Sequence, residues 1–148
     1  MVCVSLVCQS AFGASYWVSK TGDDQNDCSN RESGACLTIQ KGISVLSPGD
    51  TLNIGEGIYS DDGRFSPYLT SGTPGYFVSS PQNVSSFVFV LDRSGTALEP
   101  IIIQADPLNT GEAVIDGGHR LNGEPTNAGG VFMNYQDYIH IKDLTFRN

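Results

Sequence analysis

Residues 47–59, SPGDTLNIGEGIY, constrain the fold more strongly than any other part of this 148-residue chain. Pro48 and Gly49 end the preceding helical pattern, and Leu52 and Ile54 then alternate on one face of a short strand. The glycines that follow turn the chain before a second strand begins. A strand of four residues cannot bury its own apolar face, so it needs neighbouring strands above or below it. The segment therefore predicts one layer of a stack.

Similar short strands are predicted along most of the chain, and clusters of turn residues separate them. They cover residues 15–19, 87–91, 100–105, 113–116 and 131–133, with two more strands within 138–148. Many short strands would also suit an antiparallel sandwich. Hairpin signals such as Asn-Gly between alternating runs are largely missing, however. We therefore favour a parallel β-helix, a solenoid in which each strand pairs with the coil above and the coil below.

Residues 38–47 have helical rather than strand periodicity. Ile39, Ile43 and Leu46 fall on one stripe, and Thr38 is in position to serve as the N-cap. Gly42 is expected to weaken this helix by about 1 kcal/mol relative to alanine. Because a short, weak helix persists only when it docks, we predict that it covers the open end of the stack as a cap.

The charge of the chain restricts its partners. Sixteen acidic and eight basic residues give a net charge of −8, and the acidic residues are scattered rather than clustered. This balance disfavours non-specific nucleic-acid binding, which needs a basic surface. It is typical of an acidic, solvated surface. An acidic polymer could bind only through bridging cations or a local basic cleft.

The first 14 residues, MVCVSLVCQSAFGA, are apolar, small and uncharged, and they are too short to span a bilayer. Small residues near Phe12 fit a secretory cleavage site, although a positively charged start is missing. We interpret this segment as the remainder of a signal peptide, and a buried first strand is the alternative. The mature protein would then be secreted or periplasmic, with no membrane segment. Its two remaining cysteines, Cys28 and Cys36, are expected to form a disulfide bond.

Two polar segments have alternative interpretations. Residues 22–27, GDDQND, resemble a loose cation-binding loop but lack the ligand spacing of an EF-hand, so turn chemistry is favoured over calcium. Residues 60–86 form a long insertion rich in Gly, Pro, Ser and Tyr. Tyr68 and Tyr76 in it could stack on sugar rings, although packing against the body of the protein is favoured.

Several of these motifs together resemble the beginning of right-handed parallel β-helix proteins. They are YWVSKTGDD, CLTIQKGISVLSPGDTLNIGEGIYSD, SGTALEPIIIQADP, AVIDGG and YIHIKDLTFRN. The relatives are polysaccharide lyases of the alginate lyase and chondroitinase B group and the family-nine pectate lyases. The resemblance implies that residues 15–148 form the N-terminal cap and first coils of such a domain, whose C-terminal remainder is missing. It also implies that the catalytic base and metal-binding acids come from later coils.

Uronate lyases neutralise a carboxylate and abstract the neighbouring proton, which requires a cationic group and a tuned base. We considered His119, His140, Lys142 and Arg147 for these roles, and exposed strand or turn positions are the favoured interpretation for all four. Hydrolysis would need two carboxylates at a set separation, for which Asp61, Asp62 and Asp116 are available. No catalytic residue, metal ligand or cofactor is therefore assigned within these residues. Calcium is considered only for the full-length protein.

The function predicted from the sequence belongs to the whole parent protein. We expect a secreted protein that acts on a polysaccharide, with a lyase that cleaves an acidic glycan by β-elimination as the favoured activity. Residues 15–148 alone would then have a structural role. The alternative is an extracellular β-helix that binds glycans or serves as a structural element without catalysis.

Overall fold

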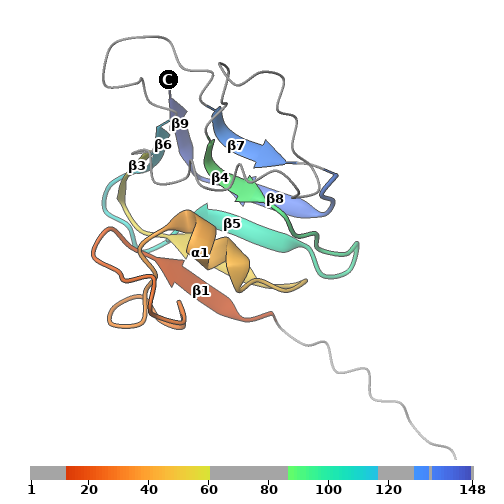
Figure 1. Ribbon diagram of the computed structural model, residues 1–148, viewed down its shortest axis with the longest axis horizontal. Helices are drawn as coiled ribbons and strands as arrows, with labels where there is room; N and C mark the ends of the chain where they lie inside the picture. The colour runs from red at the N-terminus through yellow and green to blue at the C-terminus, as the bar shows by residue number, and fades with distance from the viewer. Residues whose placement is uncertain (1–12, 61–86, 117–128, 134, 148) are drawn as a thin grey trace, which may run out of the picture.

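The computed structural model describes residues 13–60, 87–116, 129–133 and 135–147 (Figure 1). The predicted signal peptide therefore lies almost entirely outside the described residues, as does the insertion after Ser60. The elements follow the chain in the order β1 (Ser15–Val18), α1 (Ile39–Ser44), β2 (Thr51–Ile54), β3 (Gly57–Ser60), β4 (Phe87–Leu91), β5 (Ile101–Ala105), β6 (Ala113–Asp116), β7 (Gly129–Met133), β8 (Ile139–Lys142) and β9 (Thr145–Arg147). Each strand predicted from the sequence is present.

The strands form three sheets, with the orders β1-β2-β5-β8, β3-β6-β9 and β4-β7. All pairings between the described strands are parallel. Each pass of the chain adds one strand to each sheet in the same sequence, first β2, β3 and β4, then β5, β6 and β7, then β8 and β9. The antiparallel sandwich is thereby excluded for these strands. The described structure confirms a mostly β protein with parallel pairing, and its three sheets remain separate.

The hydrophobic core is formed by buried residues of α1 and of strands from all three sheets. Strand register places residues of the same character above one another, so that Tyr16, Leu52, Ile103 and Ile141 occupy one row across four strands. Leu52 and Ile103 in the middle of this row are fully buried. Stacking apolar residues on apolar residues buries area in every coil without any long strand, which explains how such short strands hold together.

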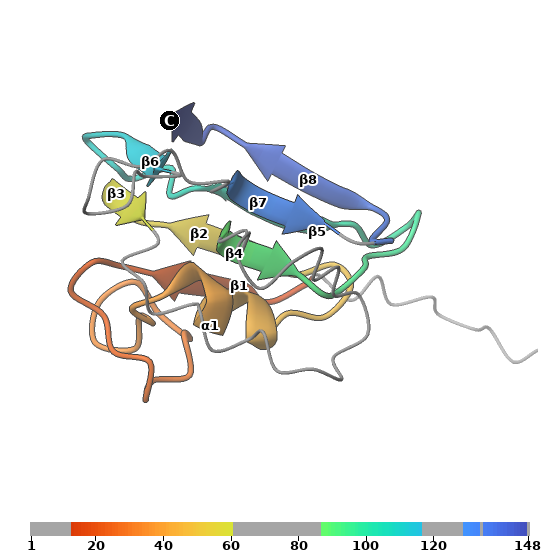
Figure 2. The ribbon, with the colours of Figure 1, turned by 45° about the horizontal axis from the view of Figure 1, so that its top comes forward.

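Helix α1 lies at the β1 end of the stack, and β8 lies at the opposite end (Figure 2). Thr38 caps it as predicted, since its hydroxyl accepts a hydrogen bond from the Lys41 amide at 3.2 Å. The helix ends at Ser44, three residues earlier than the sequence indicated. The physical reason is a competing turn, in which the Ser47 amide donates to the Asp50 carboxylate at 2.7 Å.

Gly42 has a role that helix propensity alone did not indicate. A Cβ atom at this position would lie 2.7 Å from Val18 Cγ2 and 2.7 Å from Leu52 Cδ1, both in the core. The absence of a side chain therefore lets α1 approach β1 and β2 closely. The glycine stabilises the docking of the helix, although it weakens the helix taken alone.

Replacement of Gly42 by alanine separates these two effects. Helix propensity favours alanine by about 1 kcal/mol, whereas overpacking a filled core costs about 1–3 kcal/mol. We expect Gly42→Ala to lower the free energy of unfolding, measured by urea denaturation. Ser44→Ala on the exposed side of α1 is the matched control, and its stability should not fall. A more stable Gly42→Ala protein would contradict the close packing.

The loop before α1 covers the outer edge of β1. The Trp17 amide donates to the Cys28 carbonyl at 2.8 Å, and the Cys36 amide donates to the Trp17 carbonyl at 3.0 Å. The predicted disulfide bond between Cys28 and Cys36 is present. The first strand therefore has hydrogen-bonded neighbours on both sides, and its edge is not open to other chains. No helix in the described part of the chain has the length and apolar character needed to cross a membrane.

Candidate functional site

Strand β8 carries two of the candidate residues predicted from the sequence. His140 and Lys142 are exposed, while Ile139 and Ile141 between and beside them are half-buried. Alternation along a strand places the two polar side chains on one face and the two isoleucines on the other. His140 thus points away from the core, as predicted, and the two nitrogen-containing side chains share the outer face of the sheet.

Lys142 ends a row of polar and aromatic residues across the outer face of this sheet. Strand register aligns it with Gln104 of β5, Asn53 of β2 and Trp17 of β1. Gln104 Nε2 donates to Asn53 Oδ1 at 3.0 Å, and Asn53 Nδ2 donates to the Tyr16 carbonyl at 3.3 Å. Asn53 is buried, so its amide serves the structure. The exposed Lys142 at the end of the row remains available to an anionic ligand.

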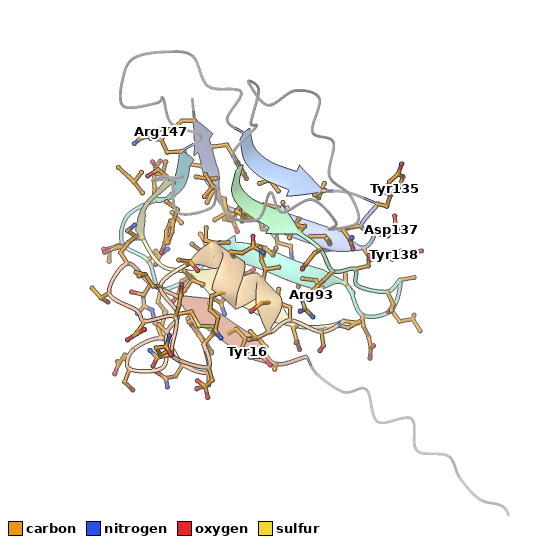
Figure 3. All side chains as sticks on the ribbon, in the orientation of Figure 1. Tyr16, Arg93, Tyr135, Asp137, Tyr138 and Arg147 are labelled. Carbon is orange, nitrogen blue, oxygen red and sulfur yellow. A yellow bond between two sulfur atoms is a disulfide. The ribbon has the colours of Figure 1, made fainter. Side chains whose placement is uncertain are left out.

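The structure pairs two other candidates with each other. Arg147 Nε donates to Asp116 Oδ2 at 2.9 Å, and the two residues are register partners on β6 and β9. The Asp116 side chain is only 13% exposed, compared with 47% for Arg147. This ion pair orients both groups on the second sheet. Arg147 lies far from the turn that carries Tyr135 and Tyr138 (Figure 3).

The remaining candidates cannot be placed. His119, Asp61, Asp62, Tyr68 and Tyr76 all lie outside the described residues. The hydrolase hypothesis therefore has one placed carboxylate, Asp116, and no measurable separation to a second one.

The carboxylates of the acidic loop at residues 22–27 accept hydrogen bonds that stabilise turns and the start of α1. Asp24 accepts hydrogen bonds from the amides of Leu37 and Thr38, each at 2.9 Å, and from the Thr38 hydroxyl at 2.8 Å. Asp23 and Asp27 accept from amides two residues further along the chain. Across the described residues, no group of three or more His, Cys, Asp or Glu side chains could hold a metal ion. The Asp24 carboxylate therefore holds this loop against the start of α1, while Asp23 and Asp27 stabilise turns within the loop.

Glu56 links two coils on the surface. Its Oε2 atom accepts from the Gly111 amide at 2.7 Å, and from the amide and hydroxyl of Thr110 at 2.9 Å each. These hydrogen bonds lower the pKa of the Glu56 carboxyl below its ordinary value of 4.5, and the bond from the Gly111 amide has the largest effect. Since the ionised form makes the contacts, the interaction stabilises the folded protein above that pH and is lost as the pH falls.

We expect the thermal stability of the protein to decrease as the pH falls from about 5 to 3, and Glu56→Gln to flatten this decrease. The amide keeps one acceptor oxygen but does not titrate. Melting temperatures measured across this range test the expectation. Glu99→Gln, on another exposed turn, is the control and should keep the slope of the parent. An unchanged slope in Glu56→Gln would exclude the carboxylate as a pH-dependent link between coils.

The turn between β7 and β8 carries two residues that the sequence analysis did not select. Tyr135 is 92% exposed and Tyr138 is 53% exposed. They project with Asp137 from one side of the molecule (Figure 3). Both tyrosines have positive φ angles, 55° and 56°. No sequence signal marks such a conformation at tyrosine, because Gly and Asn are the residues that usually indicate it.

Neither a protein-family model nor a curated protein matches this chain. A solved structure of a rhamnogalacturonan lyase superposes on 90% of the chain with a TM-score of 0.66 and 22% sequence identity. The likeness shows the fold alone. The chain spans 28% of the length of that lyase. A second solved structure, a complex of XylC with xylose, aligns with 72% of this chain at 24% sequence identity and a TM-score of 0.47. The aligned part is 12% of that structure's own chain.

Proposed function

We propose that this chain forms the capped N-terminal end of a right-handed parallel β-helix in a secreted protein that acts on a polysaccharide. The observation that carries the proposal is the regular addition of one parallel strand to each of three sheets on every pass of the chain. The coarse fold likeness to a rhamnogalacturonan lyase supports it. α1 and the disulfide loop cover the β1 end, as the terminal coil of a solenoid requires.

The opposite end of the stack supports the proposal that further coils follow in the parent protein. β7, β8 and β9 are the last strands of their sheets in the described part of the chain. Met133 and Phe146 on these strands are 54% and 47% exposed, and Ile139, Ile141 and Leu144 are only partly buried. The rows of core residues are thus uncovered at this end, and another coil would bury them.

The favoured activity of the parent protein is cleavage of an acidic glycan by β-elimination. The chain contributes Lys142 at the end of a polar row and His140 on the same strand. These positions suit the binding of a glycan carboxylate, while the proton-abstracting base would come from later coils. The disulfide bond supports secretion, because such bonds persist in oxidising compartments.

The lyase proposal is tested on the complete gene product that contains these residues. We expect it to release unsaturated, ultraviolet-absorbing products from polygalacturonate, rhamnogalacturonan or alginate, and the 148-residue chain to release none. A complete product that yields no unsaturated ends from any of these polymers would contradict the lyase proposal. It would favour the non-catalytic alternative, which the two exposed tyrosines on the β7–β8 turn also support.

The uncovered end has its own consequence for the 148-residue chain. We expect end-to-end association through β8 and β9, because an unpaired, apolar strand edge is a template for pairing. Ile141→Lys should shift the chain toward the monomer in sedimentation velocity experiments. His140→Lys adds a charge to the outer face of the same strand and should leave association unchanged. If the unsubstituted 148-residue chain were monomeric at all concentrations, the proposal that this end of the stack is open to pairing would be contradicted.

A further inference from the structure

We propose that the turn of residues 135–138, termed the tyrosine turn, binds a neutral sugar residue of a glycan chain. The inference deepens the proposed function, because it rests on a glycan as the ligand class and adds a binding site with a chemical preference. The tyrosine turn connects β7 to β8 and lies above the turn that connects β4 to β5 in the preceding coil.

Exposure alone does not distinguish the two tyrosines. Leu98, on the neighbouring turn, is 93% exposed, and isolated apolar side chains on a surface are normal. The backbone conformation sets the tyrosines apart. The left-handed region costs a residue with a side chain about 1–2 kcal/mol, and the tyrosine turn contains this conformation twice, at Tyr135 and Tyr138.

The other residues with this conformation have ordinary explanations. Apart from Gly49 and Gly57, in the described part of the chain they are Cys28, which is held in the disulfide bond, and Asp143, a residue type that tolerates this region. Neither explanation applies to an exposed tyrosine. Glycine or asparagine would form the same turn at lower cost. Bulky residues in unfavourable backbone conformations concentrate at binding sites, so the presence of two aromatic rings here indicates a role in recognition.

Hydrogen bonds hold the tyrosine turn rigidly on the preceding coil. The Gly95 amide donates to the Asp137 carbonyl, and the Ile101 amide donates to the Tyr138 carbonyl, each at 3.0 Å. The Ser94 hydroxyl lies 2.8 Å from Gln136 Oε1 and accepts from the Asp137 amide at 3.1 Å. A turn held by four hydrogen bonds, three of them to its backbone, loses little conformational freedom when a ligand binds, and this preorganisation favours affinity.

The charge beside the rings selects the ligand. Asp137 is exposed and lies between the two tyrosines in the sequence. Figure 3 shows that all three side chains project from the same side of the molecule. The basic residue on the turn below, Arg93, donates from Nη1 to the Leu46 carbonyl at 3.2 Å, and its Nε atom lies 3.6 Å from Asp92 Oδ1. An exposed carboxylate would repel a uronate. It can accept hydrogen bonds from the hydroxyls of a neutral sugar whose C–H face packs on an aromatic ring.

The test is native affinity electrophoresis of the 148-residue chain in gels that contain galactan, arabinan or xylan, with polygalacturonate as the acidic comparison. We expect at least one neutral polymer to retard the chain. The double variant Tyr135→Asn/Tyr138→Asn should lose at least about tenfold in affinity for that polymer. Leu98→Ala removes an equally exposed apolar side chain from the neighbouring turn, and its retardation should equal that of the parent.

Asparagine is chosen because it adopts the left-handed conformation more readily than tyrosine. The double variant should therefore melt at the same or a higher temperature, which separates loss of binding from loss of folding. Retardation by no neutral polymer, or equal retardation of parent and double variant, would overturn the proposal. Because the assay requires no cleavage, a retarded chain whose complete gene product forms no unsaturated ends would refute the lyase activity and leave the tyrosine turn in place.

Discussion

Replacement of Ile43 by alanine is expected to lower the free energy of unfolding by about 2–5 kcal/mol. Ile43 is fully buried on α1, which packs against β1, β2 and β4. Truncation would remove apolar contacts and leave a cavity between the helix and the first coil, where the close fit of Gly42 against Val18 and Leu52 limits collapse. Urea denaturation followed by the fluorescence of the single tryptophan, Trp17 on β1, measures the effect.

Ser44→Ala is the matched control for this experiment, since Ser44 is exposed on the same helix. Its stability should change by less than about 0.5 kcal/mol. If Ile43→Ala were as stable as Ser44→Ala, the docking of α1 would not contribute to the stability of the protein, and α1 would not act as the cap of the stack. The proposal of a terminal coil would then lose its main structural support.

The positions of the strands could be predicted from the sequence because each is a short apolar run between turn residues. The pattern around residues 47–59 identified β2 and β3, but it placed the end of the helix three residues too late. Parallel pairing followed from the scarcity of hairpin signals. The cap was predictable for a similar reason, since the stripe of Ile39, Ile43 and Leu46 had to dock on an apolar surface. All three are buried.

Contacts across coils were not predictable, because they depend on register and on the conformation of the turns between strands. The ion pair of Asp116 and Arg147 joins residues 31 positions apart, and the alignment of Lys142 with Gln104 depends on how many residues separate β5 from β8. The left-handed tyrosines are a harder case. Local preference argues against that conformation, so Tyr135 and Tyr138 could be recognised only in three dimensions.

Loss of the disulfide bond is the second change with a large expected effect. The loop that Cys28 and Cys36 close is short, with a sequence separation of eight. On the chain-entropy account, removing such a bridge costs about 2–3 kcal/mol. We therefore expect the double variant Cys28→Ala/Cys36→Ala to unfold at lower urea concentration than the parent. Alanine is preferred to serine because both sulfur atoms lie in the core, where a hydroxyl would need a partner.

The loop closed by the disulfide bond also contacts the next coil. Loss of the bond is therefore expected to lower the free energy of unfolding both locally and through this contact. Arg31 lies within the closed loop and donates from Nε to Asp106 Oδ2 at 2.6 Å, just after β5. The Asp106 side chain is 3% exposed, so loss of its partner would leave a buried carboxylate poorly compensated. Arg31→Ala with the bridge intact should therefore destabilise the protein less than the double alanine variant, which loosens both the loop and this contact. Equal stability of the parent and the double alanine variant would show that neither the bridge nor the loop secures the first coil.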